Sequence, residues 1–287
     1  MSAPGGLPDA AWVDGAPAGE VSALDRGLHY GDGLFETLAC VNGRPRFVEL
    51  HLKRLLSGCA RLALPEPEPR ALRRELEAAA AQRPSAVLKL IVTRGRAPAR
   101  GYAISGQEQG TRVLLRYPWE GEDARAAGEG VRVRLGEMRL SENPRLAGLK
   151  HLNRLEQVLA RYEWSDPQIA ESLLCSVSGA LVCGTASNLF VVHQGMLSTP
   201  PLDRCGVAGV MREVVGTLAA RHHIEFDKRP LDPAGLNAAE EIFLTNALTG
   251  IRPVRELEGR VLRVGPVTRQ LQELLAPLLS GREVLAP

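Results

Sequence analysis

The stretch "GLKHLNRLEQVLAR", residues 148–161, combines a helical apolar pattern with a lysine beside it. Apolar residues recur at the spacing of one helix face at Leu149, Leu152, Leu155 and Val158 or Leu159. Lys150 lies one residue outside this stripe. A lysine at such an edge ordinarily snorkels, with its stem buried and its ammonium in water. The alternative is an amine taken out of water, which becomes available as a nucleophile or a base.

Composition is typical of a folded, water-soluble protein. The 287 residues are enough for one large domain or two smaller ones, and we expect two. Hydrophobic residues make up 45% and charged residues 24% of the chain, and no run of about 20 apolar residues predicts a membrane span. The start "MSAPGGLPDAAW" has neither a basic nor an apolar segment of a secretory signal, so we expect a cytoplasmic location without membrane association.

Cysteine usage and charge exclude several further classes of protein. The five cysteines are odd in number and widely spaced, without a C-x-x-C pair: Cys40, Cys59, Cys175, Cys183 and Cys205. This pattern argues against a disulfide framework and against a zinc site, so we expect reduced thiols and no metal. Lysine and arginine number 35 against 33 aspartates and glutamates, and the interleaved charges indicate no nucleic-acid partner.

The order of patterns predicts an α+β chain in two domains. Two hairpins are expected, at "DGAPAG" and at "NGR", and a helix should stop before "PEPEP". We expect a smaller α+β domain over residues 1–117 and a polar linker over 118–129, which lacks apolar anchors. A larger domain should span residues 130–287 and include a helix that carries Lys150.

Two glycine-containing turns in the second half could hold an anion. "LDRCGVAGVMREVV" places Gly209 before a helix, whose first backbone N–H groups attract phosphate, although an ordinary helix cap gives the same pattern. "LTNALTG" is a strand end with small residues that a ligand could approach, or a plain turn. Neither has a P-loop or Rossmann pattern, so a small phosphorylated cofactor fits better than a nucleotide.

Candidate polar residues in the first half each have an ordinary structural alternative. Arg54 lies on an expected helix, where exposure to solvent is the common outcome. "TRGRAPARGY" carries Arg94, Arg96 and Arg100 in a loop that could bind a carboxylate or be solvated. In "DRGLHYGDGLFET", His29 or Tyr30 could be catalytic, or the segment could be a hydrogen-bonded turn.

Taken in order, these motifs resemble the fold-type IV pyridoxal-phosphate enzymes, and within them the 4-amino-4-deoxychorismate lyases. The resemblance covers almost the whole chain, through "DRGLHYGDGLFETL", "HLKRL", "TRGRAPARGY", "LAGLKHLNRLEQVLAR", "GTASNLFVV", "CGVAGVMRE" and "FLTNALTGIRPV". It implies a two-domain fold like that of D-amino-acid aminotransferases, with the cofactor in the cleft between the domains, and a homodimer. D-amino-acid and branched-chain aminotransferases share the scaffold and are the alternative activity.

The resemblance also implies roles for individual residues. Lys150 would carry pyridoxal 5'-phosphate covalently and then act as the general base on a small-molecule substrate. The phosphate would be held by Arg54, by the backbone of Gly209, Val210 and Met211, and by Ala247. Arg100, His29 and Tyr30 are the candidates for contacts with the substrate.

One position departs from the family pattern. Where the family has a glutamate just before "GTASNLF", this chain has Cys183. That glutamate pairs with the pyridine nitrogen of the cofactor, and a neutral thiol is only a weak partner for it. We therefore expect Cys183 to suppress transamination more than the lyase reaction, unless it is simply a small buried residue.

Overall fold

The computed structural model describes residues 6–96, 100–283 and 285. These residues form two compact units. The N-terminal unit comprises residues up to 121 together with 149–153, and the C-terminal unit comprises 122–148 and the residues from 154 onward. The short segment 149–153, which contains Lys150, thus groups with the N-terminal unit.

The N-terminal unit is built on a six-stranded sheet with the order β2-β1-β6-β5-β3-β4. Its strands are β1 (Ala10–Val13), β2 (Ala16–Pro17), β3 (Gly33–Val41), β4 (Arg44–Pro45), β5 (Ser85–Thr93) and β6 (Thr111–Pro118). Both expected hairpins are confirmed. Asn42 and Gly43 join β3 to β4 with φ of 53° and 69°, the left-handed conformation that a two-residue hairpin turn requires.

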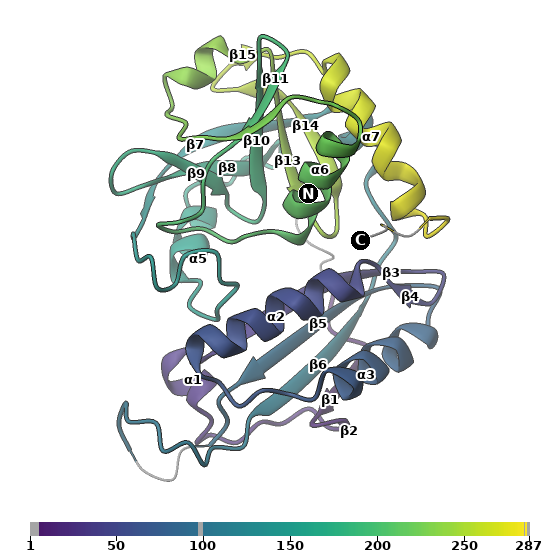
Figure 1. Cartoon of the computed structure of the whole chain (residues 1–287), viewed down its shortest axis with the longest axis vertical. Coiled ribbons are helices and arrows are strands. Elements are labelled where there is room, and N and C mark those ends of the chain that lie inside the picture. The colour runs from purple at the N-terminus through teal and green to yellow at the C-terminus, as the bar shows by residue number, and fades with distance from the viewer. Residues whose placement is uncertain (1–5, 97–99, 284, 286–287) are drawn as a thin grey trace. The chain divides into compact units, whose positions relative to one another are not determined.

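Three helices accompany this sheet: α1 (Arg26–Tyr30), α2 (Val48–Leu62) and α3 (Pro69–Ala81). Helices α2 and α3 cover one face of the sheet, as Figure 1 shows. Leu38 and Leu88 of the sheet and Leu55 of α2 are at most 1% exposed, so this face holds the core of the unit. Helix α2 ends before "PEPEP", as expected, because proline cannot continue the hydrogen-bonded ladder.

The segment around Lys150 is extended, so the expectation that a helix carries Lys150 is wrong. Phe35 N–H donates to the Lys150 carbonyl (2.9 Å), and Leu152 N–H donates to the Gly33 carbonyl (3.0 Å). Helix α5 (Leu155–Tyr162) begins only afterwards. The apolar spacing is real, but the backbone groups of this segment are used by β3 and are therefore not available for a helical turn.

The C-terminal unit contains a nine-stranded sheet with the order β12-β11-β10-β13-β14-β7-β8-β9, in which β15 also pairs with β14. Its strands are β7 (Val131–Leu140), β8 (Ile169–Ser176), β9 (Leu181–Gly184), β10 (Asn188–His193), β11 (Met196–Thr199), β12 (Phe226–Lys228), β13 (Glu241–Asn246), β14 (Gly250–Leu257) and β15 (Arg260–Val261). Its remaining helices are α4 (Ala124–Glu129), α6 (Val210–Arg221), the 3₁₀ turn η1 (Gly235–Ala238) and α7 (Pro266–Leu279).

Helices and strands of this unit enclose an apolar core. Phe190 and Phe243 stack with ring centroids 4.9 Å apart, and Ile242 and Leu244 pack into a second cluster through the alternate positions of β13. The stretch expected to be a linker holds α4, which Asp123 caps and whose Ala126 packs against that cluster. Among the described residues, every helix falls short of the length and apolar character needed to cross a lipid bilayer.

Candidate active site

Lys150 and Lys89 face one aromatic ring in the N-terminal unit. The Lys150 ammonium lies 4.2 Å from the centroid of the Phe35 ring, and the Lys89 ammonium lies 5.5 Å from it. Phe35 is on the sheet face away from α2 and α3, where Lys89 pairs across the strands with Thr37. Both ammonium groups are therefore within reach of one ring-sized ligand, and each is attracted to the face of Phe35.

Arg54 takes part in a buried hydrogen-bonded triad with Glu36 and His51. Arg54 Nε donates to Glu36 Oε1 (2.7 Å), Arg54 Nη2 donates to Glu36 Oε2, and His51 Nδ1 lies 2.6 Å from the same oxygen. Burial opposes ionisation of Glu36, but the His51 hydrogen bond and the Arg54 charge outweigh burial and lower the pKa of Glu36 to about 2. Burial, with the charges of Arg54 and Lys150, lowers the pKa of His51, so the neutral ring donates its Nδ1–H to Glu36.

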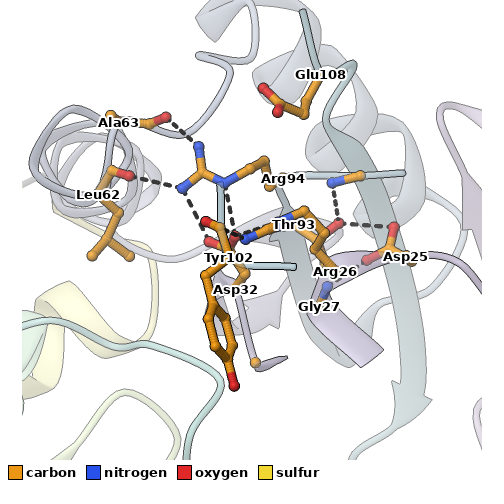
Figure 2. Close-up of polar contacts among 12 residues, drawn as sticks. Asp25, Arg26, Gly27, Asp32, Leu62, Ala63, Thr93, Arg94, Tyr102 and Glu108 are labelled. Atoms are coloured by element: carbon orange, nitrogen blue, oxygen red, sulfur yellow. Dashed lines mark hydrogen bonds and ion pairs between the residues drawn. The ribbon is translucent and has the colours of Figure 1, made fainter. Parts of the chain in front are cut away.

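A second ionic cluster fixes the turn that precedes β3. Arg26 Nε and Arg94 Nε both donate to Asp32 Oδ2, at 2.9 and 2.7 Å. Figure 2 shows Arg94 also reaching the carbonyls of Leu62 and Ala63 at the end of α2. Arg94 is 3% exposed, and its guanidinium is hydrogen-bonded to Asp32 and to the end of α2. It therefore has a structural role and is not available to a substrate carboxylate.

The proposed substrate contacts of this unit lie near that cluster. His29 is exposed, and its Nε2 lies 2.7 Å from the Ala23 carbonyl. Tyr30 is half-buried, with its ring 5.2 Å from that of Tyr102 and under the Arg26 guanidinium. Arg100 is exposed, and residues 97–99 of the same loop lie outside the described residues. The structure thus brings Tyr30 and Tyr102 together and leaves Arg100 exposed on its loop.

In the C-terminal unit, the start of α6 has the features of an anion site. Gly209 is the N-cap residue and offers no side-chain cap, and a Cβ there would lie 2.0 Å from Asn188 Oδ1. Asn188 pairs across the strands with Thr245, so both side chains lie on one face of the sheet. Within the described part of the chain, the buried Thr245 hydroxyl has no hydrogen-bond partner.

Two further phosphate candidates lie in α6 itself, and a third lies in the turn after β13. Val210 and Met211 form the first turn of α6, where backbone N–H groups have no partner within the helix. Ala247 lies in the turn after β13, two residues beyond Thr245, and Asn246 Oδ1 holds that turn by accepting from the N–H groups of Leu248 and Thr249. A small anion at the start of α6 would thus meet several donors.

Cys183 is buried on β9 opposite Leu174 and packs in an apolar cluster with Ala160 of α5. Burial raises the pKa of its thiol to about 12, so the side chain is neutral at physiological pH. The charge of Arg154 lies close enough to affect this pKa, and burial lowers the pKa of Arg154 itself. Cys183 therefore supplies no negative charge at this position.

Sequence reasoning missed Glu36, His51, Lys89, Asn188 and Thr245. Glu36 and Lys89 left a signal, because each is a charged residue inside an otherwise apolar strand, "LFETLAC" and "VLKLIVT". Charged side chains are seldom buried unless they are paired, so a charge at these two positions indicates an ion-pair partner or a ligand. Asn188 and Thr245 left no such signal, since small polar residues are common at strand ends.

Residues 33–257 match the family described as "Amino-transferase class IV". Aminodeoxychorismate lyase from Vibrio harveyi is 31% identical over 265 residues, which cover 91% of this chain and 97% of that protein. The crystal structure of 4-amino-4-deoxychorismate lyase from Pseudomonas aeruginosa is 49% identical, with a TM-score of 0.90, over 94% of this chain and 99% of that one. Branched-chain aminotransferase from Thermoproteus uzoniensis shares the fold, with a TM-score of 0.84 at 24% identity over 96% of this chain and 95% of that one.

These findings confirm the fold-type IV resemblance that the motifs indicated. The match extends from the first residue of β3 to the last residue of β14 and so includes Lys150, Arg54 and the start of α6. The chain belongs to the amino-transferase class IV family.

Proposed function

We propose that the protein is a pyridoxal-phosphate-dependent lyase that converts 4-amino-4-deoxychorismate to 4-aminobenzoate and pyruvate, a step of folate biosynthesis. The observation that carries this proposal is the 49% identity to the Pseudomonas aeruginosa lyase over 99% of that chain. The enzyme works in the cytoplasm as a homodimer, takes a small-molecule substrate, and has no nucleic-acid or membrane partner.

The residues present fit the cofactor. The start of α6 suits a phosphate, because its backbone N–H groups lie at the positive end of the helix dipole. The buried Thr245 hydroxyl of β13, which has no partner among the described residues, supplies a further donor. Lys150 supplies the amine, and Arg54 supplies a guanidinium that Glu36 holds in place. When bound, the cofactor withdraws electrons from the substrate carbon that carries the amine, so that the proton there becomes acidic.

The chemical work of the protein is then to move one proton and to orient the substrate. The Lys150 amine removes the proton at C4, and the electron pair of that C–H bond forms the C3–C4 double bond of the ring. The C3–O bond breaks, and the enolpyruvate that leaves takes up a proton and becomes pyruvate. The ring becomes aromatic, so the elimination is downhill and the protein mainly positions groups.

Lys89 is a candidate for binding a substrate carboxylate. The substrate carries its amine and its ring carboxylate at opposite ends of one six-membered ring. The Lys150 and Lys89 ammonium groups both lie near the Phe35 ring, at 4.2 and 5.5 Å from its centroid. With the amine at Lys150, the carboxylate comes within reach of the Lys89 ammonium, and Phe35 provides an apolar surface for the substrate ring.

The proposal is tested with purified protein supplied with pyridoxal 5'-phosphate. We expect a visible absorbance band and the release of pyruvate and 4-aminobenzoate in equal amounts from 4-amino-4-deoxychorismate. Lys150→Ala should remove the band and lower turnover by several orders of magnitude, whereas Lys53→Ala, an exposed lysine on α2, should change neither.

A parallel assay addresses the alternative activity. D-alanine aminotransferase from Bacillus licheniformis is 26% identical over 89% of this chain, so transamination of D-alanine and of branched-chain amino acids is measured beside the lyase reaction. Faster transamination than lyase turnover would replace the proposed function by an aminotransferase. Turnover near wild type in Lys150→Ala would reject both.

A further inference from the structure

Two oppositely charged residues are buried among the apolar strands of the C-terminal unit: Glu171 of β8 (3% exposed) and Arg252 of β14 (8%). Glu171 lies on the same strand face as Leu173, which belongs to the apolar core of this unit. Arg252 Nη2 donates to Glu171 Oε2 (2.8 Å), so the two charges compensate each other. Apolar residues in place of such a pair often cost no stability, so the pair calls for a further explanation.

The other carboxylate oxygen, Glu171 Oε1, holds residues 184–187, the connection between β9 and β10 that we call the β9–β10 turn. It accepts from the Ala186 N–H (2.6 Å) and from the Ser187 hydroxyl (2.8 Å). A Cβ at Gly184 would lie 2.5 Å from the same oxygen, so a glycine is needed for the carboxylate to come this close. The carboxylate therefore fixes the position of the β9–β10 turn.

The β9–β10 turn is in turn bonded to both segments that carry the phosphate candidates. The Ala186 carbonyl accepts from Nδ2 of Asn246 (3.4 Å), the residue that holds the turn after β13. Asn188, the first residue of β10, donates from Nδ2 to the Val207 carbonyl (2.9 Å), just before the start of α6. A displaced β9–β10 turn would therefore displace the donors that both segments offer to an anion.

Arg252 explains how a carboxylate can serve close to an anion site. A lone buried carboxylate would repel a nearby phosphate, and the repulsion is strong where water is excluded. Arg252 compensates that charge at Oε2 and leaves Oε1 to the β9–β10 turn. A glutamine could not satisfy both sides, because its NH₂ group would face a donor on one of them.

We propose that Glu171 is a positioning residue of the phosphate site. Through the β9–β10 turn, it holds the start of α6 and the turn after β13 in the arrangement that binds a phosphate. This inference deepens the proposed function, on which it rests for the identity of the anion, the phosphate of pyridoxal 5'-phosphate. Glu171 acts only through the turn and contacts neither cofactor nor substrate.

The test compares Glu171→Gln with the wild type by an absorbance titration with pyridoxal 5'-phosphate and by phosphorus NMR of the bound cofactor. We expect the dissociation constant of the cofactor to rise at least about tenfold, the equivalent of one net hydrogen bond. At saturation with the cofactor, the phosphorus resonance of the bound form should move toward that of free cofactor, because the phosphate loses hydrogen bonds. A loss of stability alone would not move this resonance.

Glu241→Gln is the matched control. Glu241 is a similarly buried glutamate of the same unit (4% exposed) and accepts hydrogen bonds from the backbone of Val267 and Thr268 and from the Thr268 hydroxyl. It begins β13, whereas Asn246 ends that strand. Its replacement should therefore lower stability but leave the cofactor dissociation constant and the phosphorus resonance as in the wild type.

Ser187→Ala is a milder variant that removes one bond to the β9–β10 turn and keeps the pair of Glu171 with Arg252. It should change both readouts in the same direction as Glu171→Gln, by a smaller amount.

Wild-type readouts in Glu171→Gln, or equal changes in Glu241→Gln, would overturn the positioning role. If Glu171→Gln does not fold, wild-type readouts in Ser187→Ala overturn it. A wild type that does not bind the cofactor would reject the proposed function and this inference together. Neither readout depends on turnover, so a protein that binds the cofactor without lyase activity would reject the proposed function alone.

Discussion

Replacing Glu36 by glutamine tests the buried triad that holds Arg54. The carboxylate accepts two hydrogen bonds from Arg54 and one from His51, and it is 1% exposed. A glutamine keeps one acceptor oxygen but turns an NH₂ group toward donors. Arg54 then loses its bidentate partner, and a half-buried guanidinium is left with its charge uncompensated by this carboxylate.

Two estimates of the stability that Glu36→Gln should remove agree. The pKa of Glu36 is about 2 against an ordinary 4.5, and at about 1.36 kcal/mol for each pKa unit the folded state favours the ionised form by about 3 kcal/mol. Removing one partner of a buried ion pair costs about 3–5 kcal/mol in other proteins. We therefore expect Glu36→Gln to lower the free energy of unfolding of the N-terminal unit by about 3–5 kcal/mol.

Urea unfolding followed by circular dichroism measures this loss. The control is Glu49→Gln on α2, the helix that carries Arg54; the Glu49 carboxylate is 68% exposed and pairs with Arg73, so that it contributes about 0–1 kcal/mol. Glu36→Gln should also weaken pyridoxal 5'-phosphate binding in an absorbance titration, because Arg54 loses its fixed orientation. A Glu36→Gln protein as stable as the Glu49→Gln control would refute the argument.

The pH dependence provides a second check on the same residue. Since the pKa of Glu36 is lowered on folding, its contribution to stability is present above the ordinary value of 4.5 and is lost as the pH falls toward about 2. The wild type should therefore lose more stability than Glu36→Gln across this range. Parallel curves for the two proteins would show that Glu36 is not the titrating group.

Three other substitutions test the proposed site. Gly209→Ala places a Cβ 2.0 Å from Asn188 Oδ1, so it should weaken cofactor binding at least about tenfold in an absorbance titration, while Gly128→Ala, with open space around it, should not. Lys89→Met should raise KM for 4-amino-4-deoxychorismate more than it lowers kcat, and an unchanged KM would remove Lys89 from the substrate site. Cys183→Glu should speed the lyase reaction and increase transamination with alanine by a larger factor; if neither rate changes, Cys183 does not face the ring nitrogen of the cofactor.

Local features of the sequence determined several turns, the end of one helix and the family. Asn42 and Gly43 specify a hairpin because both adopt positive φ at little cost, and the prolines after Leu62 stop α2 by removing a hydrogen-bond donor. The sequence also placed Gly209 at a helix start, because an amphipathic pattern follows it. Such features depend on a few neighbouring residues, and the ordered motifs that contain them were sufficient to indicate the family.

Contacts between distant segments decided what periodicity could not. The spacing from Leu149 to Leu159 predicts one continuous helix. However, backbone groups around Lys150 form hydrogen bonds with β3, and the helix starts only at Leu155. The same spacing does not tell which side of α5 faces solvent, because an apolar stripe looks identical in sequence whether its own unit or a partner covers it.

The partners of the charged residues were decided in the same way. Arg54 and Arg94 looked alike in the sequence, but Glu36 and Asp32 lie 18 and 62 residues away along the chain and reach them only in the folded unit. A charge is stabilised by whichever group meets it in space, and sequence separation carries no information about that group. The sequence by itself therefore determined the hairpin turns, the end of α2 and the family, and only the tertiary structure decided where α5 begins and which side chains surround Lys150, Arg54 and Arg94.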